Sequence, residues 1–394
     1  MPFKRQKTRD AGHALQRRKT AAMEDYLQAL PEEEARDDAE PSKGLEITTD
    51  NIAVNLRVTR GPDWTWGEED GDKTGVVLSF DKAKGLAHVL WEGGQAHKHY
   101  RFGQGKSDLA ICTSSGTSAL GRRNSQLFFA SKSQTLLIFD WDDTLFPTTY
   151  EASLKLVRDD LKLVWNKPLK DQDLSSAEKT TISKKLELCS SHVVELLKGA
   201  DRCGKVVLLT LARAPWVSES CKNFYPSVGR LITQLKIPIV YAQEGIQVDY
   251  NKEKMSTDEE IERFWSSVKG KAIARECNKF YSQYEGQSWK NVISIGDSDF
   301  ERLGTQHAME NYMRETGIHS DGKLVDVNGH LYKVRTKTFK MLDEPTVEEL
   351  TVEVDMLKAW LPLMVKLDSS FDVNLNNADD PEVLKSIDTT LRGQ

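Results

Sequence analysis

Between residues 135 and 345 the sequence alternates continuous apolar runs with longer stretches of helical spacing. The runs are TLLIFD (135–140), KVVLLT (205–210), IPIVYA (237–242) and NVISIGD (291–297). Runs of this length are typical of strands that are buried on both faces of a parallel sheet. Helical patterns lie between them, over roughly 151–166, 176–200, 217–235 and 257–284. The alternation predicts a three-layer α/β domain with a doubly wound, Rossmann-like sheet.

The limits of this domain follow from the segments around the four runs. Residues 337–342 are a candidate final strand, and 346–366 has the acidic first turn and apolar spacing of a helix. We therefore place the α/β domain at 135–366. The 70 residues between Asp140 and Thr210 leave room for a small helical cap only, at about 150–200. Residues 367–394 are polar and are predicted to form a loose tail.

The residues before this domain follow a different pattern. Apolar residues alternate with polar ones from Ile52 to Val58, and strand candidates bounded by glycines follow at 75–80, 86–91 and 97–102. Short strands at close, even spacing predict a small all-β antiparallel barrel over 50–112. Residues 1–49 carry basic and then acidic charge and are predicted to be a disordered tail. The Ser/Gly-rich segment 113–134 is predicted to be a linker.

Composition excludes several classes of protein. The 394 residues carry 54 Lys and Arg against 60 Asp and Glu, a net charge of −6, which argues against nucleic acid as a partner. No apolar run approaches the roughly 18 residues that a membrane span needs. The five cysteines are far apart, which argues against a disulfide framework and against a zinc ribbon or RING-type site. Because the N-terminus has no apolar signal segment, we expect an intracellular protein, cytoplasmic or nuclear.

Polar residues suited to phosphate chemistry follow three of the buried runs. Asp140 and Asp142 leave the first run, Thr210 ends the second, and Asp297 follows the last. A carboxylate that attacks phosphorus needs a cation to reduce repulsion and a second acid to protonate the departing oxygen. A threonine hydroxyl can hold a phosphoryl oxygen, and carboxylates in an exposed turn suit Mg²⁺. Each feature taken singly also fits a solvated turn or a strand-end threonine.

The order of these features resembles the four motifs of the haloacid dehalogenase (HAD) superfamily over roughly 135–345. The resemblance implies that Asp140 is a nucleophile that forms an aspartyl-phosphate and that Asp142 is the general acid/base. It implies that Thr210 orients the phosphoryl group and that a lysine near 270 neutralises charge. Mg²⁺ would be held by the Asp140 carboxylate, the Asp142 main-chain carbonyl and Asp297. The surroundings of Thr210 and Asp297 also resemble HAD-like proteins of algae and protists.

Two assignments within this resemblance stay open. Lys269 and Lys271 both precede Asp297, and we prefer Lys269 as the catalytic lysine because its spacing to Glu276 matches that subgroup. Asp299 and Glu301 both follow Asp297. Glu301 lies at the usual offset of the family and is the candidate metal ligand, whereas Asp299 is also a candidate helix N-cap.

The predicted barrel carries a second signature. Residues 60–71 (RGPDWTWGEEDG) and 100–103 (YRFG) resemble the Mind bomb/HERC-type (MIB/HERC) domain, an SH3-like barrel found in certain ubiquitin ligases. The resemblance implies a protein or peptide ligand, for which Trp64, Trp66 and Tyr100 are the candidate binding residues. The chain shows neither RING spacing nor a remainder large enough for a HECT domain, so it is not expected to be a ligase by itself.

Two functions are compatible with the sequence. In the first, the chain is a Mg²⁺-dependent phosphohydrolase that acts through an aspartyl-phosphate, and the barrel targets it to a protein. In the second, it is a non-catalytic adaptor in ubiquitin-ligase pathways, and its α/β domain is an idle scaffold. The sequence identifies neither the phosphorylated substrate nor the peptide partner.

Overall fold

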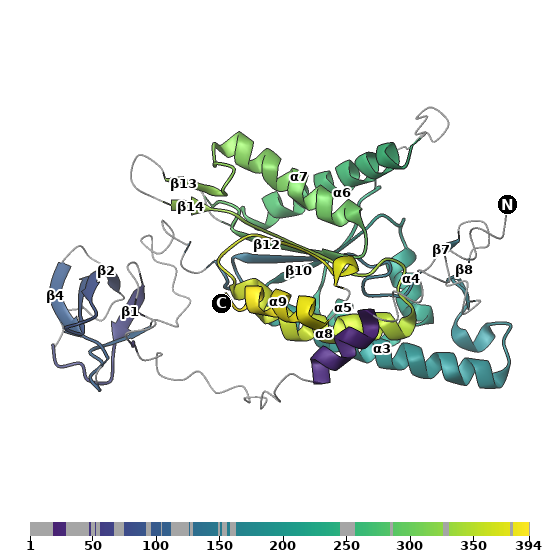
Figure 1. Cartoon of the computed structure of the whole chain (residues 1–394), viewed down its shortest axis with the longest axis horizontal. Coiled ribbons are helices and arrows are strands. Elements are labelled where there is room, and N and C mark those ends of the chain that lie inside the picture. The colour runs from purple at the N-terminus through teal and green to yellow at the C-terminus, as the bar shows by residue number, and fades with distance from the viewer. Residues whose placement is uncertain are drawn as a thin grey trace. The chain divides into compact units, whose positions relative to one another are not determined.

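The computed structural model describes most of the chain. The described residues are 19–28, 47–48, 52, 56–66, 75–91, 96–103, 105–111, 126, 129–148, 150–151, 156–157, 163–244, 257–283, 287–325, 331–378 and 381–393. The chain divides into two compact units (Figure 1). One comprises residues 1–30, 129–324 and 332–394, and the other comprises residues 31–128 and 325–331.

The larger unit is built on a six-stranded parallel sheet. In spatial order its strands are β11 (Ile239–Tyr241), β10 (Lys205–Thr210), β6 (Thr135–Phe139), β12 (Asn291–Gly296), β15 (Arg335–Lys340) and β16 (Phe371–Asn374). Each neighbouring pair runs parallel. The parallel α/β sheet of the prediction is therefore confirmed, and its four apolar runs and the segment 337–342 supply five of the strands.

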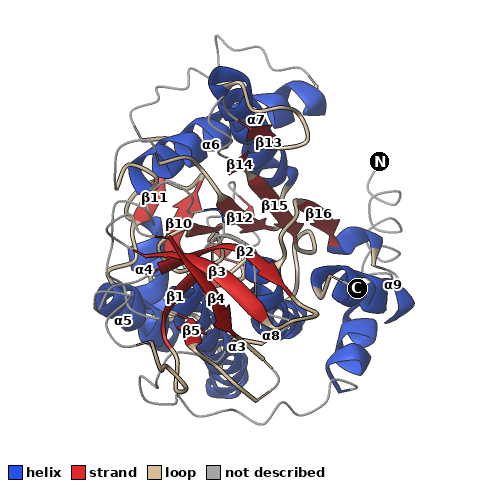
Figure 2. Ribbon diagram, turned by 90° about the vertical axis from the view of Figure 1, so that its left-hand side faces the viewer, coloured by secondary structure: helices blue, strands red, loops and turns tan. Residues whose placement is uncertain are grey.

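Helices cover both faces of this sheet (Figure 2). On one face, α6 (Asp258–Phe280) and α7 (Asp299–Thr316) pack with Leu136 and Ile138 of β6. On the other, α3 (Ser176–Cys203), α4 (Trp216–Asn223), α5 (Pro226–Leu235) and α8 (Val347–Lys366) pack with Leu137 and Phe139. Successive side chains of a strand point to opposite faces, which is why β6 is apolar throughout. Among the described residues, no helix has both the length and the apolar character to cross a membrane.

Capping boxes define where α3, α6, α7 and α8 begin. In each, a Ser or Thr at the N-cap accepts a hydrogen bond from the backbone of a Glu three residues later, whose side chain accepts one in return. In α7 the pair is Ser298 and Glu301. Asp299, the N-cap candidate of the sequence, is instead the first residue of the helix, because Ser298 before it supplies the cap.

The segment predicted as a helical cap differs from the prediction. Residues 151–166 contain short antiparallel strands and no described helix: β7 (Tyr150–Glu151), β8 (Leu156–Val157) and β9 (Leu163–Val164). The following helix, α3, is a layer of the domain rather than a cap. Its buried residues include Leu186, Val193 and Leu197. They form one apolar stripe that packs in the same core cluster as Leu137 and Phe139 of β6.

Both predicted tails contain ordered structure. Residues 19–28 form a helix within the segment predicted as a disordered tail, and Tyr26 packs edge-on against Trp360 of α8 with ring centroids 5.6 Å apart. The C-terminal segment, predicted as a loose tail, contains the edge strand β16 and α9 (Pro381–Leu391). Both segments are polar overall, which is why the sequence predicted loose tails. A few buried apolar side chains, including Leu384 and Leu391, are enough to pack them on the domain. Residues 1–18 and 29–46 lie outside the described residues, as does most of the predicted linker.

The helix at 19–28 can be tested by mutation. Met23 is fully buried in it, next to an exposed Glu24. We expect Met23→Ala to lower the free energy of unfolding by about 2–5 kcal/mol, because it leaves a cavity in the core. Urea denaturation followed by far-UV circular dichroism measures the change, and Glu24→Ala should remain within about 0.5 kcal/mol of wild type. Equal stability of the two variants would contradict this packing.

The smaller unit contains a five-stranded antiparallel sheet. Its strand order is β4 (Ala96–Arg101), β3 (Leu86–Trp91), β2 (Gly75–Asp81), β1 (Arg57–Arg60) and β5 (Leu109–Ile111). Buried and partly buried residues alternate along β3, the pattern expected of a strand with one face on a core. The antiparallel all-β fold agrees with the sequence, while closure into an SH3-like barrel stays a prediction.

Candidate active site

The residues that the sequence singled out meet at one edge of the parallel sheet. Phe139 of β6 pairs with Leu208 of β10 on one side and with Ile295 of β12 on the other. Asp140, Thr210 and Asp297 follow or end these strands, and the backbone N–H of Asp140 donates to the Ile295 carbonyl at 2.9 Å. Parallel strands in this register end together, so residues 70 and 157 positions apart along the chain from Asp140 lie at one rim.

Asp140 is buried beside a lysine. The Lys269 Nζ lies 3.0 Å from Asp140 Oδ2, and its side chain is 1% exposed. The other oxygen of Asp140, Oδ1, is buried and has no hydrogen-bond partner among the described residues. Burial raises the pKa of Asp140 above its ordinary value, and the charge of Lys269 opposes this rise. One oxygen of Asp140 is therefore paired with the lysine, and the other has no partner among the described residues.

Asp142 is held by two donors. The Thr210 hydroxyl donates to Asp142 Oδ2 at 2.8 Å, and the Trp216 indole Nε1–H donates to Oδ1 at 2.7 Å. Burial, followed by the nearby charge of Asp140, raises the pKa of Asp142. A carboxyl group with a raised pKa can carry a proton that it later donates, as a general acid requires.

The loop between these acids and the next strand is fixed by a third acid. Asp143 has a left-handed backbone (φ 49°), and its carboxylate accepts a hydrogen bond from the Thr148 backbone N–H at 2.6 Å. The Asp143 N–H donates to the Phe146 carbonyl at 2.8 Å. Asp143 therefore holds the loop in shape.

Asp297 is bound through both its side chain and its backbone. The Thr144 hydroxyl donates to Asp297 Oδ1 at 3.4 Å, and the Lys340 ammonium donates to the Asp297 carbonyl at 2.7 Å. Burial raises the pKa of Asp297 to about 8, with a further contribution from the charge of Asp140. Carboxylates gathered so closely repel one another unless a cation lies among them.

Glu301 links the lysine to the start of α7. It forms an ion pair with Lys269 through Oε1, and its Oε2 accepts a hydrogen bond from the Ser298 backbone N–H at 3.1 Å. Gly296 is required for this approach, since a Cβ there would lie 2.5 Å from Glu301 Cγ. Glu301 is buried, whereas Asp299 pairs with Arg302 at 3.1 Å at the outside of the helix.

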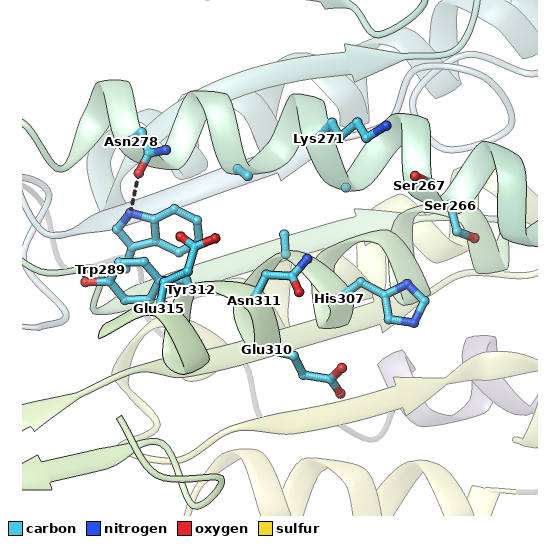
Figure 3. A pocket seen from close by; sticks show the side chains of 13 residues that line it. Ser266, Ser267, Lys271, Asn278, Trp289, His307, Glu310, Asn311, Tyr312 and Glu315 are labelled. Carbon is cyan, nitrogen blue, oxygen red and sulfur yellow. Dashed lines mark hydrogen bonds between the residues drawn. The ribbon is translucent and has the colours of Figure 1, made fainter. Parts of the chain in front are cut away.

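Of the two candidate lysines, only Lys269 lies in this site. Lys271 is exposed and lines a separate pocket of about 420 Å³ between α6 and α7 (Figure 3). That pocket contains none of the acids described above. Two residues along a helix are turned by about 200°, which directs the two lysines to different sides of α6.

The acids can accommodate a divalent cation. Among the described residues, Asp140, Asp297 and Glu301 each offer a carboxylate oxygen, and these oxygens lie within 4.8 Å of one another. The uncommitted Oδ1 of Asp140 and the all-oxygen donor set fit Mg²⁺. The Asp142 carboxylate is bound to Thr210 and Trp216, so it is the main-chain carbonyl of Asp142, which the sequence placed in the metal site, that stays a predicted ligand.

Beside Asp142 the site opens into a cleft of about 880 Å³. It is lined by Asp142, Thr148, Trp165, Asn166, Leu211, Ala212, Arg213, Ala214, Pro215, Trp216 and Gln243. Sequence reasoning assigned no role to Trp216 or Lys340, although both bind site acids. The spacing between Thr210 and Trp216 does not predict a contact with Asp142. Lys340 lies on a strand that was recognised from its apolar residues, which say nothing about the role of a lysine.

In the smaller unit the three candidate peptide-binding residues form one aromatic cluster. Trp64 stacks on Tyr100 with ring centroids 5.3 Å apart, and Trp66 meets Tyr100 edge-on at 5.6 Å. Trp66 is 36% exposed, and its indole N–H donates to Asp108 Oδ2 at 3.0 Å. Tyr100 is fully buried, so its side chain has no exposed surface. Trp64 and Trp91 cover the ring of Tyr100, so we expect Tyr100 to act in peptide binding only through these neighbours.

The smaller unit is similar to a known protein family. The Mib_herc2 family model matches residues 55–113. Residues 55–113 form a MIB/HERC domain. The E3 ubiquitin-protein ligase MIB2 of Gallus gallus is 34% identical over 113 residues, which are 26% of this chain and 10% of that protein. The E3 ubiquitin-protein ligase mind-bomb of Drosophila melanogaster is 41% identical over 66 residues, 16% of this chain and 5% of that protein. The chain thus spans a tenth or less of these relatives.

Among solved structures, the trehalose-6-phosphate phosphatase of Aspergillus fumigatus covers 61% of this chain and is itself covered over 99% of its length. The sequence identity is 14% and the TM-score is 0.26. At this TM-score the similarity establishes neither a shared fold nor a shared activity.

Proposed function

We propose that the α/β domain is a Mg²⁺-dependent HAD-type phosphomonoesterase that acts through an aspartyl-phosphate, and that the MIB/HERC domain binds a protein that brings it to its substrate. The observation that carries this proposal is the Asp140 carboxylate. It is buried at the sheet edge, with one oxygen 3.0 Å from the Lys269 ammonium and the other without a partner among the described residues. The order of motifs in the sequence adds independent support.

The residues divide the reaction between them. Asp140 attacks phosphorus and forms an O–P bond, while the bond from phosphorus to the ester oxygen breaks and its electron pair passes to that oxygen. Asp142 gives its proton to the departing oxygen. Asp142 then takes a proton from a water molecule that attacks phosphorus, the bond from phosphorus to Asp140 breaks, and inorganic phosphate leaves.

Three further groups support these steps. Thr210 holds Asp142 through its hydroxyl, and we expect it to orient the phosphoryl group when substrate is bound. Lys269 neutralises negative charge on Asp140 and on the phosphoryl group. Asp140 and Asp297, with Glu301 adjacent, would hold Mg²⁺, which when bound supplies further neutralisation of the phosphoryl oxygens.

A non-catalytic adaptor in ubiquitin-ligase pathways is the second candidate function. The observation that favours it is the match of residues 55–113 to the MIB/HERC family and to two E3 ubiquitin-protein ligases. In that case the acids of the α/β domain would be a structural remnant with no affinity for a phosphoryl group.

Beryllium fluoride, a mimic of a phosphoryl group on aspartate, separates the two functions without knowledge of the substrate. Together with Mg²⁺ it should raise the Tm of the full chain by about 5 °C, because a ligand at 100 times its Kd stabilises by about 2.7 kcal/mol. The shift should vanish in Asp140→Asn and when Mg²⁺ is omitted. Thermal unfolding by calorimetry measures it. A wild-type chain whose Tm is unmoved by Mg²⁺ and beryllium fluoride would favour the adaptor.

A further inference from the structure

The leaving group of the substrate must lie in the cleft beside Asp142. This step rests on the proposed function, in which Asp142 protonates the departing oxygen and must therefore touch it. Asp142 and Thr148 lie in the lining of the cleft together with Trp165 and Trp216. Asp140 and Lys269 are not among the lining residues of this cleft. The part of the substrate attached to the departing oxygen is thus received by the cleft.

Aromatic and aliphatic side chains make up the walls of this cleft. Trp165, which follows β9, meets Trp216 at the start of α4 with ring centroids 6.0 Å apart and an interplanar angle of 66°. Leu211 and Pro215 continue the wall. Because the Trp216 indole N–H is bound to Asp142, the ring of Trp216 lies beside the carboxyl group that would protonate the departing oxygen.

The polar side chains of the lining are Asp142, Thr148, Asn166, Arg213 and Gln243, of which Asn166 and Arg213 are exposed at its rim. Gln243 Nε2 donates to the Leu211 carbonyl at 2.5 Å, and its Oε1 accepts from Arg213 Nε at 3.5 Å. The Thr148 hydroxyl donates to the Phe146 carbonyl at 3.3 Å. A polyhydroxylated leaving group such as a sugar needs donors and acceptors on several sides, whereas next to Asp142 this lining presents the rings of Trp165 and Trp216.

We propose that the α/β domain prefers aryl phosphate monoesters, and that the phenolic ring of a phosphotyrosine side chain packs on Trp165 and Trp216. An aromatic ring that packs on other aromatic rings in a partly desolvated cleft gains binding free energy beyond that of the buried area alone. The bond that breaks joins phosphorus to the phenolic oxygen, which takes the electron pair and the proton of Asp142. Trp165 acts here as a specificity-determining residue, since its side chain makes no hydrogen bond to the site acids.

Phosphotyrosine and phosphoserine are a matched pair of substrates that tests the preference. Both carry the same amino and carboxyl groups and differ in the aryl ring. We expect Trp165→Ala to lower kcat/KM for phosphotyrosine about 10-fold and that for phosphoserine less than 2-fold, because only the former loses a ring contact. Trp165→Phe should retain most of the phosphotyrosine activity. Leu188→Ala, which changes an exposed side chain of α3 outside the sites described above, is the control and should change neither value.

The outcomes distinguish this inference from the proposed function. Equal losses for the two substrates, or no loss for either, would overturn the aryl preference while leaving the phosphatase intact. If no substrate is hydrolysed by the wild type, the proposed function fails and the inference fails with it. Binding of phenylphosphonate, which resists hydrolysis, to Asp140→Asn provides a second measurement by calorimetry. Its Kd should rise about 10-fold with Trp165→Ala and change little with Trp165→Phe, and an unchanged Kd in Trp165→Ala would contradict the ring contact.

Discussion

We expect the Asp140→Asn variant to lose turnover of phosphate monoesters by at least about 10³-fold, because an amide cannot form the covalent intermediate. The substitution preserves the shape of the side chain in a buried position. It also removes a carboxylate whose pKa burial raises, so folding should not suffer. Hydrolysis of p-nitrophenyl phosphate with saturating Mg²⁺, followed by its absorbance, measures the effect.

Two controls make this result specific. Asp299→Asn changes an acid two residues from Asp297 that is directed to Arg302, and it should retain the activity of wild type. Removal of Mg²⁺ with a chelator should abolish turnover in wild type, and its return should restore it. If Asp140→Asn hydrolysed the ester as fast as wild type, Asp140 would not be the nucleophile and the observed activity would have another origin.

The second large effect is expected for Lys269→Met. The Lys269 ammonium is buried between two carboxylates, 3.0 Å from Asp140 and paired with Glu301. Its loss leaves two buried acids without a counter-charge, which should cost about 3–5 kcal/mol of stability. Turnover should fall at least about 10²-fold, because the lysine also neutralises the phosphoryl group.

Lys271→Met is a matched control on the same helix. Lys271 is exposed, so its loss should change stability by less than about 0.5 kcal/mol and leave turnover unchanged. Chemical denaturation and p-nitrophenyl phosphate hydrolysis measure both quantities. Indistinguishable behaviour of the two variants would show that Lys269 does not hold Asp140 in solution.

Much of the α/β fold follows from local pattern. A continuous apolar run such as β6 must be buried on both faces, and only a parallel sheet with helices on each side provides such a place. The same pattern places Asp140, Thr210 and Asp297 at strand ends, and so at one edge. The prediction was wrong for the cap, because helical spacing over 151–166 competes with strand pairing that local pattern does not reveal.

The contacts within the site depend on side chains that lie far apart in the sequence. Whether Lys269 or Lys271 approaches Asp140 depends on the rotation of α6 about its axis, which packing on the sheet sets. The start of α7 brings Glu301 back toward Lys269 through its capping box with Ser298. The contact of Trp216 with Asp142 joins the first residue of α4 to the turn that follows β6.

The amino-acid sequence alone determined the strands, the acids that follow them and the MIB/HERC signature, because each depends on residues within one short segment. Only the three-dimensional structure decided that Tyr100 is covered, that residues 19–28 pack on α8 and that Lys269 lies between Asp140 and Glu301. Such contacts join residues separated by tens to hundreds of positions. Their geometry is set by how whole helices and sheets pack, which short-range periodicity does not encode.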